Sequence, residues 1–265
     1  MNPGTSGLER GLAVLQALAG AEASSRGGLG VVRLAELVGS DKSQTSRTLV
    51  TLAEHGLVER DPDTLSYRIG WQVFALAARA GEPRLLAAAP RLLRELVHQL
   101  GESAHLSVRQ GASVLTLLSE SPASAIHAPG LVGVLTPLAN TSAGRALAFD
   151  LADDELAALG LGATADRIAE ARALGYAVVR EEFEPGLVAA AAPVRDSSGR
   201  VVAAVNVSAP AFRFAHRLDE AAAAVVAAAA ELSADLGAPR QSAASGMHVR
   251  GAPRPPRPES RGGRT

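Results

Sequence analysis

The sequence has no cysteine, one lysine and few aromatic residues. Without cysteine the chain has no disulfide, no thiolate metal ligand and no cysteine nucleophile, a composition that suits a reducing compartment. Its longest apolar run, 221–230, is ten Ala and Val residues, well short of the ~20 that span a bilayer. No basic segment followed by an apolar one opens the chain, so we expect no signal peptide, no membrane partner and a cytoplasmic location.

Charge is nearly balanced overall but unevenly distributed. The 26 basic and 27 acidic residues give a net charge of −1, so any contact with nucleic acid must come from local charge. Residues 238–265 hold six Arg, one Glu and five Pro without apolar periodicity, which predicts a disordered basic tail. The whole chain is 47% apolar, and its length suits two domains at about 100–200 residues each.

Residues 6–70 have the element order of a winged helix-turn-helix. Leucines at helical spacing predict a first helix, 32–38 a second, and 42–54 a third that Ser40 or Asp41 can cap. Strands at 57–60 and 66–69, joined through a turn containing Pro62, predict a β-hairpin. A linker helix is expected over 71–83.

Residues 84–237 alternate between strand and helix patterns. We expect a first helix from about Leu85 and an α+β domain around an antiparallel sheet. The expected strands are 105–109, 113–120, 176–180, 187–194 and 201–208, and the expected helices are 142–150, 153–160, 165–174 and 219–236.

The third helix has one face suited to a polyanion. At about 100° per residue, Thr45, Leu49 and Leu52 fall on a packing side, and no acid occurs over 42–53. On the other side, Arg47 can donate two hydrogen bonds to guanine and Gln44 can pair with adenine. The expected DNA-binding residues are Lys42, Ser43, Gln44, Ser46 and Arg47, with Arg60, Tyr67 and Arg68 on the wing.

The last strand pair predicts a polar face in the second domain. If 196–199 form a four-residue turn, Arg195 pairs with Arg200 and Ala189 lies opposite Asn206. Alternation then places Val202, Ala204, Asn206 and Ser208 on one face. This face is either a ligand-binding surface or the side of an edge strand whose polar side chains contact solvent. Small residues at 142–144 open a helix whose amides can bind an anion, although ordinary capping explains them equally well.

Several segments together resemble the IclR family of transcriptional regulators. In the first domain they are Leu34-Ala-Glu-Leu-Val38, Lys42-Ser-Gln-Thr-Ser-Arg47, Leu52-Ala-Glu-His-Gly-Leu-Val-Glu-Arg60 and Tyr67-Arg-Ile-Gly70. In the second they are Gly101-Glu-Ser-Ala-His-Leu106, the run 136–146, Gly175-Tyr-Ala with Glu181-Glu182, the run 186–196 and the run 199–208. The resemblance covers roughly residues 6–237.

The resemblance implies a GAF-like effector domain at 84–237 and a dimer or dimer of dimers that binds a double-stranded DNA operator. It places a small organic effector, a carboxylate or an aromatic compound, among Ser142, Ala143, Gly144, Glu182, Ala189, Asn206 and Ser208. Ala189 stands where the family often has Cys or Ser, which favours a partly apolar ligand. Gln44, Thr48, Arg145 and Val179 also depart from the usual residues.

The alternatives are an enzyme and a second domain that only mediates oligomerisation. Gly101-Glu-Ser103-Ala-His105 resembles a hydrolase elbow but has His where the last Gly is needed. The histidines at 98, 105, 127 and 216 lack the spacing of metal ligands, and no phosphate-binding glycine motif occurs. We therefore expect no catalysis, metal or cofactor. Exposure of Asn206 and Ser208 would favour the oligomerisation module.

Overall fold

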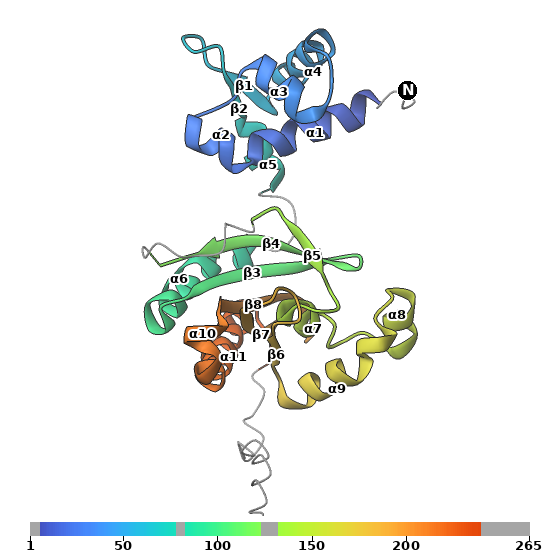
Figure 1. Cartoon of the computed structure of the whole chain (residues 1–265), viewed down its shortest axis with the longest axis vertical. Coiled ribbons are helices and arrows are strands. Elements are labelled where there is room, and N and C mark those ends of the chain that lie inside the picture. Colours follow the sequence, from blue (N-terminus) through green and yellow to red (C-terminus); the bar gives the residue numbers. More distant parts are fainter. Residues whose placement is uncertain (1–5, 78–82, 123–131, 240–265) are drawn as a thin grey trace, which may run out of the picture.

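The computed structural model describes residues 6–77, 83–122 and 132–239. It shows an N-terminal body of helices with a small hairpin and a C-terminal body built on a larger antiparallel sheet (Figure 1). The tail expected at 238–265 lies outside the described residues except for Ala238 and Pro239, and so does His127. No helix within the described ranges is long and apolar enough to cross a membrane.

The N-terminal body contains the predicted helix-turn-helix and wing. Its elements are α1 (Gly7–Ala19), α2 (Ala21–Arg26), α3 (Val31–Val38), α4 (Lys42–Glu54), β1 (Val58–Arg60) and β2 (Tyr67–Ile69). A capping box between Ser6 and Glu9 starts α1, and Gly39 in the left-handed conformation ends α3. The sequence did not predict α2, which lies between the first and second expected helices.

The core of this body differs from the leucine stripe expected on α1. Leu18 is buried with Val14, whereas Leu8 and Leu12 are 74% and 52% exposed. Gly11 faces α4 instead: a Cβ at Gly11 would lie 3.9 Å from Leu52. The buried face of α1 is therefore the one that carries Gly11, Val14 and Leu18.

Two helices follow the hairpin. The helix α5 (Trp71–Ala77) has no buried residue, and α6 (Pro83–Leu100) begins the C-terminal body. The expected linker helix at 71–83 thus corresponds to α5 as far as Ala77, because 78–82 lie outside the described residues.

The C-terminal sheet is antiparallel throughout, with strand order β5-β4-β3-β8-β7-β6. The strands are β3 (Ser103–Gln110), β4 (Ser113–Glu120), β5 (Leu135–Pro137), β6 (Ala177–Arg180), β7 (Leu187–Arg195) and β8 (Val201–Pro210). The remaining helices are α7 (Ser142–Leu147), α8 (Asp153–Ala158), α9 (Ala165–Leu174), α10 (Ala211–Phe214) and α11 (Leu218–Asp235), with short 3₁₀ turns at Gly162–Thr164 and Ala215–Arg217.

Helices cover both faces of this sheet (Figure 1). One apolar core joins α6 and α11 to side chains such as Leu106 and Val205, and a second joins α7, α8 and α9 to Val114 and Ala204. The mixed α+β class expected from the sequence is confirmed. Successive side chains of β3 and β8 alternate between the two cores, so one set of alternating residues faces α7.

The register expected for the last hairpin is wrong. Ala189 lies opposite Ser208, and Ala191, not Ala189, lies opposite Asn206. The turn has five residues, closed by a 2.9 Å hydrogen bond from the Asp196 amide to the Arg200 carbonyl. Pairing then shifts at the end of β7, which leaves Val202 as an extra residue in β8. Because of this bulge, Val202 packs on the α11 side and does not share a face with Asn206.

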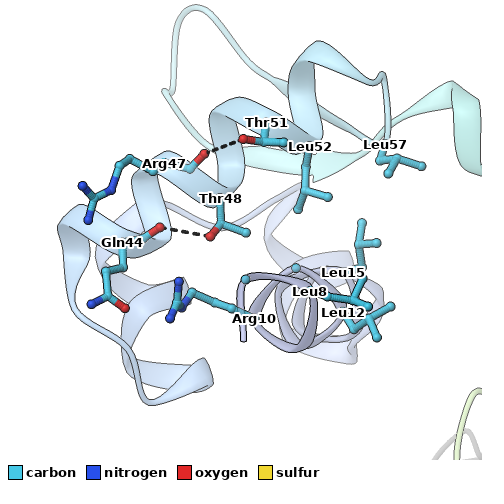
Figure 2. A pocket seen from close by; sticks show the side chains of 12 residues that line it. Leu8, Arg10, Leu12, Leu15, Gln44, Arg47, Thr48, Thr51, Leu52 and Leu57 are labelled. Carbon is cyan, nitrogen blue, oxygen red and sulfur yellow. Dashed lines mark hydrogen bonds between the residues drawn. The ribbon is translucent and has the colours of Figure 1, made fainter. Parts of the chain in front are cut away.

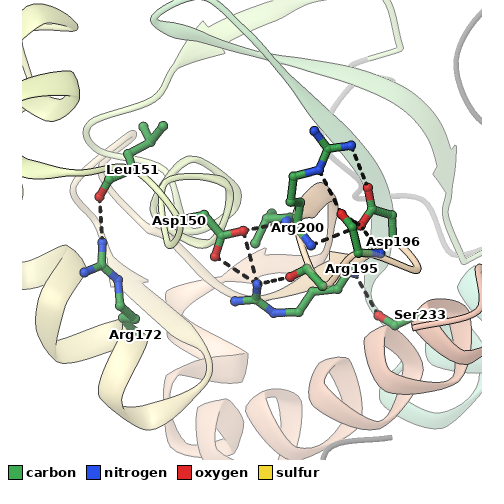
Figure 3. A network of polar contacts seen from close by, with 10 residues as sticks. Asp150, Leu151, Arg172, Arg195, Asp196, Arg200 and Ser233 are labelled. Atoms are coloured by element: carbon green, nitrogen blue, oxygen red, sulfur yellow. Dashed lines mark hydrogen bonds and ion pairs between the residues drawn. The ribbon is translucent and has the colours of Figure 1, made fainter. Parts of the chain in front are cut away.

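Polar contacts fix the same turn to neighbouring elements (Figure 3). The Asp150 carboxylate accepts hydrogen bonds from Arg195 at 2.9 Å and from the Val201 amide at 2.6 Å. The Arg195 amide donates to Ser233 of α11 at 2.9 Å. The turn is thereby tied to the segment after α7 and to α11, which holds the shifted register in place.

Candidate DNA-binding surface and effector site

The helix α4 presents the surface predicted for DNA. Asp41 caps it by accepting from the Gln44 amide at 2.8 Å, and Thr45 and Leu49 are fully buried. Lys42, Ser43 and Arg47 are exposed, while Gln44 and Ser46 are partly buried. Neither Lys42 nor Arg47 forms an ion pair with any residue that the structure describes, so both cations remain available to a polyanion.

The wing supports only part of the expected contact set. Arg60 is exposed, with its guanidinium 5.7 Å from the centre of the Tyr67 ring. Arg68 is exposed but pairs with Glu59 at 3.1 Å. Tyr67 is 7% exposed and packs in the core of the N-terminal body, where its backbone also pairs with Leu29. That burial contradicts the DNA contact expected for Tyr67.

Hydrogen bonds at Asp61 shape the wing turn. Its carboxylate accepts from the amides of Thr64 at 2.8 Å and Asp63 at 3.0 Å. These bonds, led by the one from Thr64, lower the pKa of Asp61, so the turn is held by a charged carboxylate at neutral pH.

A groove of about 480 Å³ lies between α1 and α4 (Figure 2). Figure 2 shows leucines of α1 and α4 toward one end and Arg10, Gln44 and Arg47 toward the other. The groove therefore adjoins the predicted base-reading side chains. No acidic residue lines it.

The expected effector residues lie on the side of the sheet that α7 covers. Ser142, Ala143 and Gly144 form the buried first turn of α7, and β7 and β8 beneath it carry Ala189, Asn206 and Ser208. The Gly144 amide already donates to the Thr141 hydroxyl at 3.1 Å, so capping uses one of the amides considered for an anion. A Cβ at Gly144 would lie 2.1 Å from the Leu138 carbonyl oxygen, which shows how closely α7 packs here.

Glu182 is engaged by two arginines. The Arg145 guanidinium donates to both carboxylate oxygens, at 3.1 Å in one case, and Arg167 also pairs with Glu182. Asn140 donates to the Glu182 carbonyl at 3.1 Å. Sequence reasoning missed these partners because Arg145 and Arg167 come from helices 15 or more residues away. Arg145 is 4% exposed, and its Nε has no partner among the described residues.

The strand β3 adds polar residues that the sequence analysis did not select. Its side chains Ser103, His105 and Ser107 face the α7 side, and alternation of polar and apolar residues in 103–108 was the available signal. His105 is 2% exposed, lies opposite Asn206 and bonds to the Ser208 hydroxyl through Nε2 at 3.1 Å. Burial lowers the pKa of His105 to about 4, so its ring is neutral at neutral pH.

The pairing of His105 with Ser208 does not reproduce a hydrolase triad. A triad requires a group, usually a carboxylate, on the second ring nitrogen of the histidine. The Nδ1 atom of His105 has no partner in the described ranges, and a pKa near 4 makes this ring a weak base at neutral pH. Ser103 bonds to Ser121 at 3.0 Å, away from His105.

None of the seven expected effector residues lines either of two sizeable cavities of the described chain. One is the groove between α1 and α4. The other, also of about 480 Å³, lies beside α11 and is lined by residues such as Phe149, Pro193 and Ala230. The helix α7 packs on the sheet through the apolar core that it shares with Ala191 and Ala204.

The fold and the α4 surface define a helix-turn-helix transcriptional regulator. The family model for the bacterial transcriptional regulator IclR C-terminal domain matches residues 79–234, and the model for the IclR helix-turn-helix domain matches residues 7–62. The chain belongs to the IclR family. This confirms the resemblance found in the sequence.

Named relatives cover nearly the whole chain. The regulator BhcR of Paracoccus denitrificans is 32% identical over 260 residues, which is 91% of this chain and 90% of BhcR. The solved structure of a putative regulator from Rhodococcus has a TM-score of 0.67 and 27% identity, and the match covers 88% of this chain and 98% of that one. A Microbacterium hydrocarbonoxydans IclR homologue, solved with 4-hydroxybenzoate, has a TM-score of 0.71 at 21% identity, with coverage of 87% and 99%.

Proposed function

We propose that this regulator reads a double-stranded operator through α4 and that a small organic effector, bound under α7, changes its affinity for the operator. One observation carries the DNA-reading part. Lys42 and Arg47 project from an acid-free helix face without an ion pair among described residues, on a body whose other exposed arginines largely pair with acids. The phosphates of DNA can supply the negative charge that Lys42 and Arg47 lack as partners in the described chain.

The α4 side chains divide between base reading and positioning. Arg47 is suited to bidentate bonds with guanine and Gln44 to adenine, while Ser43 and Ser46 can hold phosphates or base edges. Lys42 lies in the first turn of α4, where backbone amides also attract phosphate. On the wing, Arg60 remains a candidate contact to the DNA backbone. Arg68 becomes a second such contact if its ion pair with Glu59 breaks.

Arg47→Ala tests the base-reading role. We expect it to weaken binding to a guanine-containing operator by about 1–3 kcal/mol and to relax the preference at that base pair. Fluorescence anisotropy against the chain's own upstream intergenic duplex and a scrambled duplex, at fixed salt, measures both. Arg84→Ala removes an exposed arginine from α6 as the matched control. An unchanged sequence preference in Arg47→Ala would assign base reading to other residues.

The effector part rests on the small and uncharged residues under α7. Asn206 is 9% exposed, Ser208 is partly buried, and neither has the exposure expected of a domain that only mediates oligomerisation. A relative of the same fold was solved with 4-hydroxybenzoate. We infer an organic acid of similar size as the effector. Because α7 lies against the sheet, binding of the effector requires α7 to move. The effector shifts operator binding only if its affinity differs between the two positions of α7.

Asn206→Leu tests the effector site. The leucine keeps the volume but removes the amide, so we expect the response of DNA binding to an effective acid to be lost while binding without the acid is retained. The acid is selected beforehand from a panel of small organic acids in the anisotropy assay. Gln99→Leu, at an exposed position of α6, is the control and should respond normally. Retention of the full response in Asn206→Leu would place the site elsewhere.

We further infer that the protein acts as a dimer or a dimer of dimers. The helix α5 exposes 74% of Trp71 and 64% of Phe74, whose ring centres lie 5.5 Å apart, and so offers an apolar surface to a second copy. Paired helix-turn-helix bodies read half-sites about one DNA turn apart, so a change in their spacing alters operator affinity. Light scattering measures the assembly state.

A further inference from the structure

The polar face under α7 contains a buried histidine with one unused ring nitrogen. His105 is 2% exposed, Nε2 bonds to Ser208, and Nδ1 has no partner among the described residues. A neutral imidazole has one donor and one acceptor nitrogen, and the Ser208 hydroxyl can serve either. The Nδ1 atom is therefore free to donate or to accept, and leaving it unpaired costs free energy.

The side-chain amide of Asn206 is also unused. Asn206 is the direct cross-strand neighbour of His105, and its side chain makes no hydrogen bond within the described ranges. On the other side of Asn206 the partner is Ala191, and Ser208 likewise faces Ala189. The neighbours of Asn206 and Ser208 on β7 therefore have only methyl side chains.

The described side chains next to His105 on this face carry no charge. The side chains nearest along β3 and β4 are hydroxyls that already pair with each other, Ser107 with Thr116 at 3.4 Å and Ser103 with Ser121 at 3.0 Å. The buried guanidinium of Arg145 is committed to Glu182. A carboxylate placed against His105 would thus be a buried charge without a cation, which is costly, whereas a hydroxyl needs only the donor and acceptor present.

We propose that His105 and Asn206 select a small hydroxy acid by hydrogen-bonding its uncharged hydroxyl group on the floor of the effector site. The inference rests on the proposed effector site under α7 and adds the chemical group that this site recognises. The carboxylate of the same ligand lies away from the His105 floor. Neither residue type is explained by core packing alone, because a buried polar side chain ordinarily finds a partner within the protein.

Pairs of acids that differ by one hydroxyl test this inference. Calorimetric titration of the full-length protein with 4-hydroxybenzoate and benzoate, and with glycolate and acetate, gives the ratio of dissociation constants within each pair. For at least one pair we expect the hydroxy acid to bind wild-type protein about 10-fold or more tightly, because its deoxy analogue leaves buried polar groups unpaired. In His105→Phe, which keeps an aromatic ring without nitrogen, that ratio falls to about 1.

Controls separate this inference from the proposed function. His98→Phe, at an exposed position of α6, should keep the wild-type ratio, and His105→Asn provides a second variant if the phenylalanine does not fold. Equal binding of both members of each pair to wild-type protein, or a preference that survives both His105 variants, overturns the hydroxyl assignment and leaves the effector site standing. Failure of every acid to bind wild-type protein overturns the effector site itself, and this inference with it.

Discussion

Gly144→Ala is expected to destabilise the C-terminal body by about 3 kcal/mol or more, because the added methyl overlaps a backbone that cannot rotate away. Its Cβ would lie 2.1 Å from the Leu138 carbonyl oxygen and 2.7 Å from the Leu138 Cα. Helix propensity alone predicts the opposite sign, a gain of about 1 kcal/mol for Ala over Gly. Urea denaturation followed by circular dichroism therefore decides between local preference and tertiary contact.

Gly162→Ala is the matched control for this substitution. It lies in the short 3₁₀ turn before α9, and a Cβ there has nothing within 4 Å. We expect a change within about 0.5 kcal/mol. If Gly144→Ala were as stable as Gly162→Ala, the segment at Leu138 would be able to shift, and α7 would not be pinned to it in the way that the structure shows.

Acidification is expected to destabilise the wild-type protein more than a His105→Gln variant. The pKa of His105 is about 4 in the folded chain, below its ordinary value of 6.5, because burial disfavours the charged ring. Between these two values the unfolded state takes up a proton that the folded state does not, so stability falls as pH drops from 6.5 toward 4. The shift of the His105 pKa corresponds to a loss of about 3 kcal/mol in the free energy of unfolding.

The comparison of the two proteins isolates the histidine. Asp61 and Asp196 have a lowered pKa, mainly from hydrogen bonds donated by the Thr64 amide and the Ser198 hydroxyl, and also lose stability in acid. The contributions of the two aspartates to the free energy of unfolding are the same in both proteins, so they cancel when the two proteins are compared. Free energies of unfolding from urea titrations at pH 7 and pH 4 measure the remaining difference. Parallel pH dependence of wild type and His105→Gln would mean that the ring gains solvent or a partner in solution.

Local patterns were sufficient to predict which side of α4 packs against the core. The acid-free stretch at 42–53 and helical periodicity predicted which residues of α4 pack, and Thr45 and Leu49 are fully buried as expected. Asp41 caps the helix through a contact three residues away. These relations involve neighbours along one helix, so they follow from the chain itself. Tyr67 was chosen for its residue type and its place in the wing, and neither tells which side of a three-residue strand faces the core.

The candidate effector site depended on relations that sequence spacing does not contain. The five-residue turn and the bulge at Val202 each shifted the register by one residue, and together they moved the partner of Asn206 from Ala189 to Ala191. The contact of Arg145 with Glu182 joins residues 37 positions apart. His105 read as an isolated histidine until pairing of β3 with β8 placed it beside Asn206 and Ser208.

The sequence by itself determined the family, through the resemblance of its motifs, and it determined the α+β class, the helix-turn-helix and the polar face of α4, because short-range periodicity encodes them. Tertiary structure alone decided which side of α1 is buried, which alanine faces Asn206 and that Arg145 reaches Glu182. Those outcomes depend on the packing of helices, on register across strands and on burial, each of which is a property of several segments packed together.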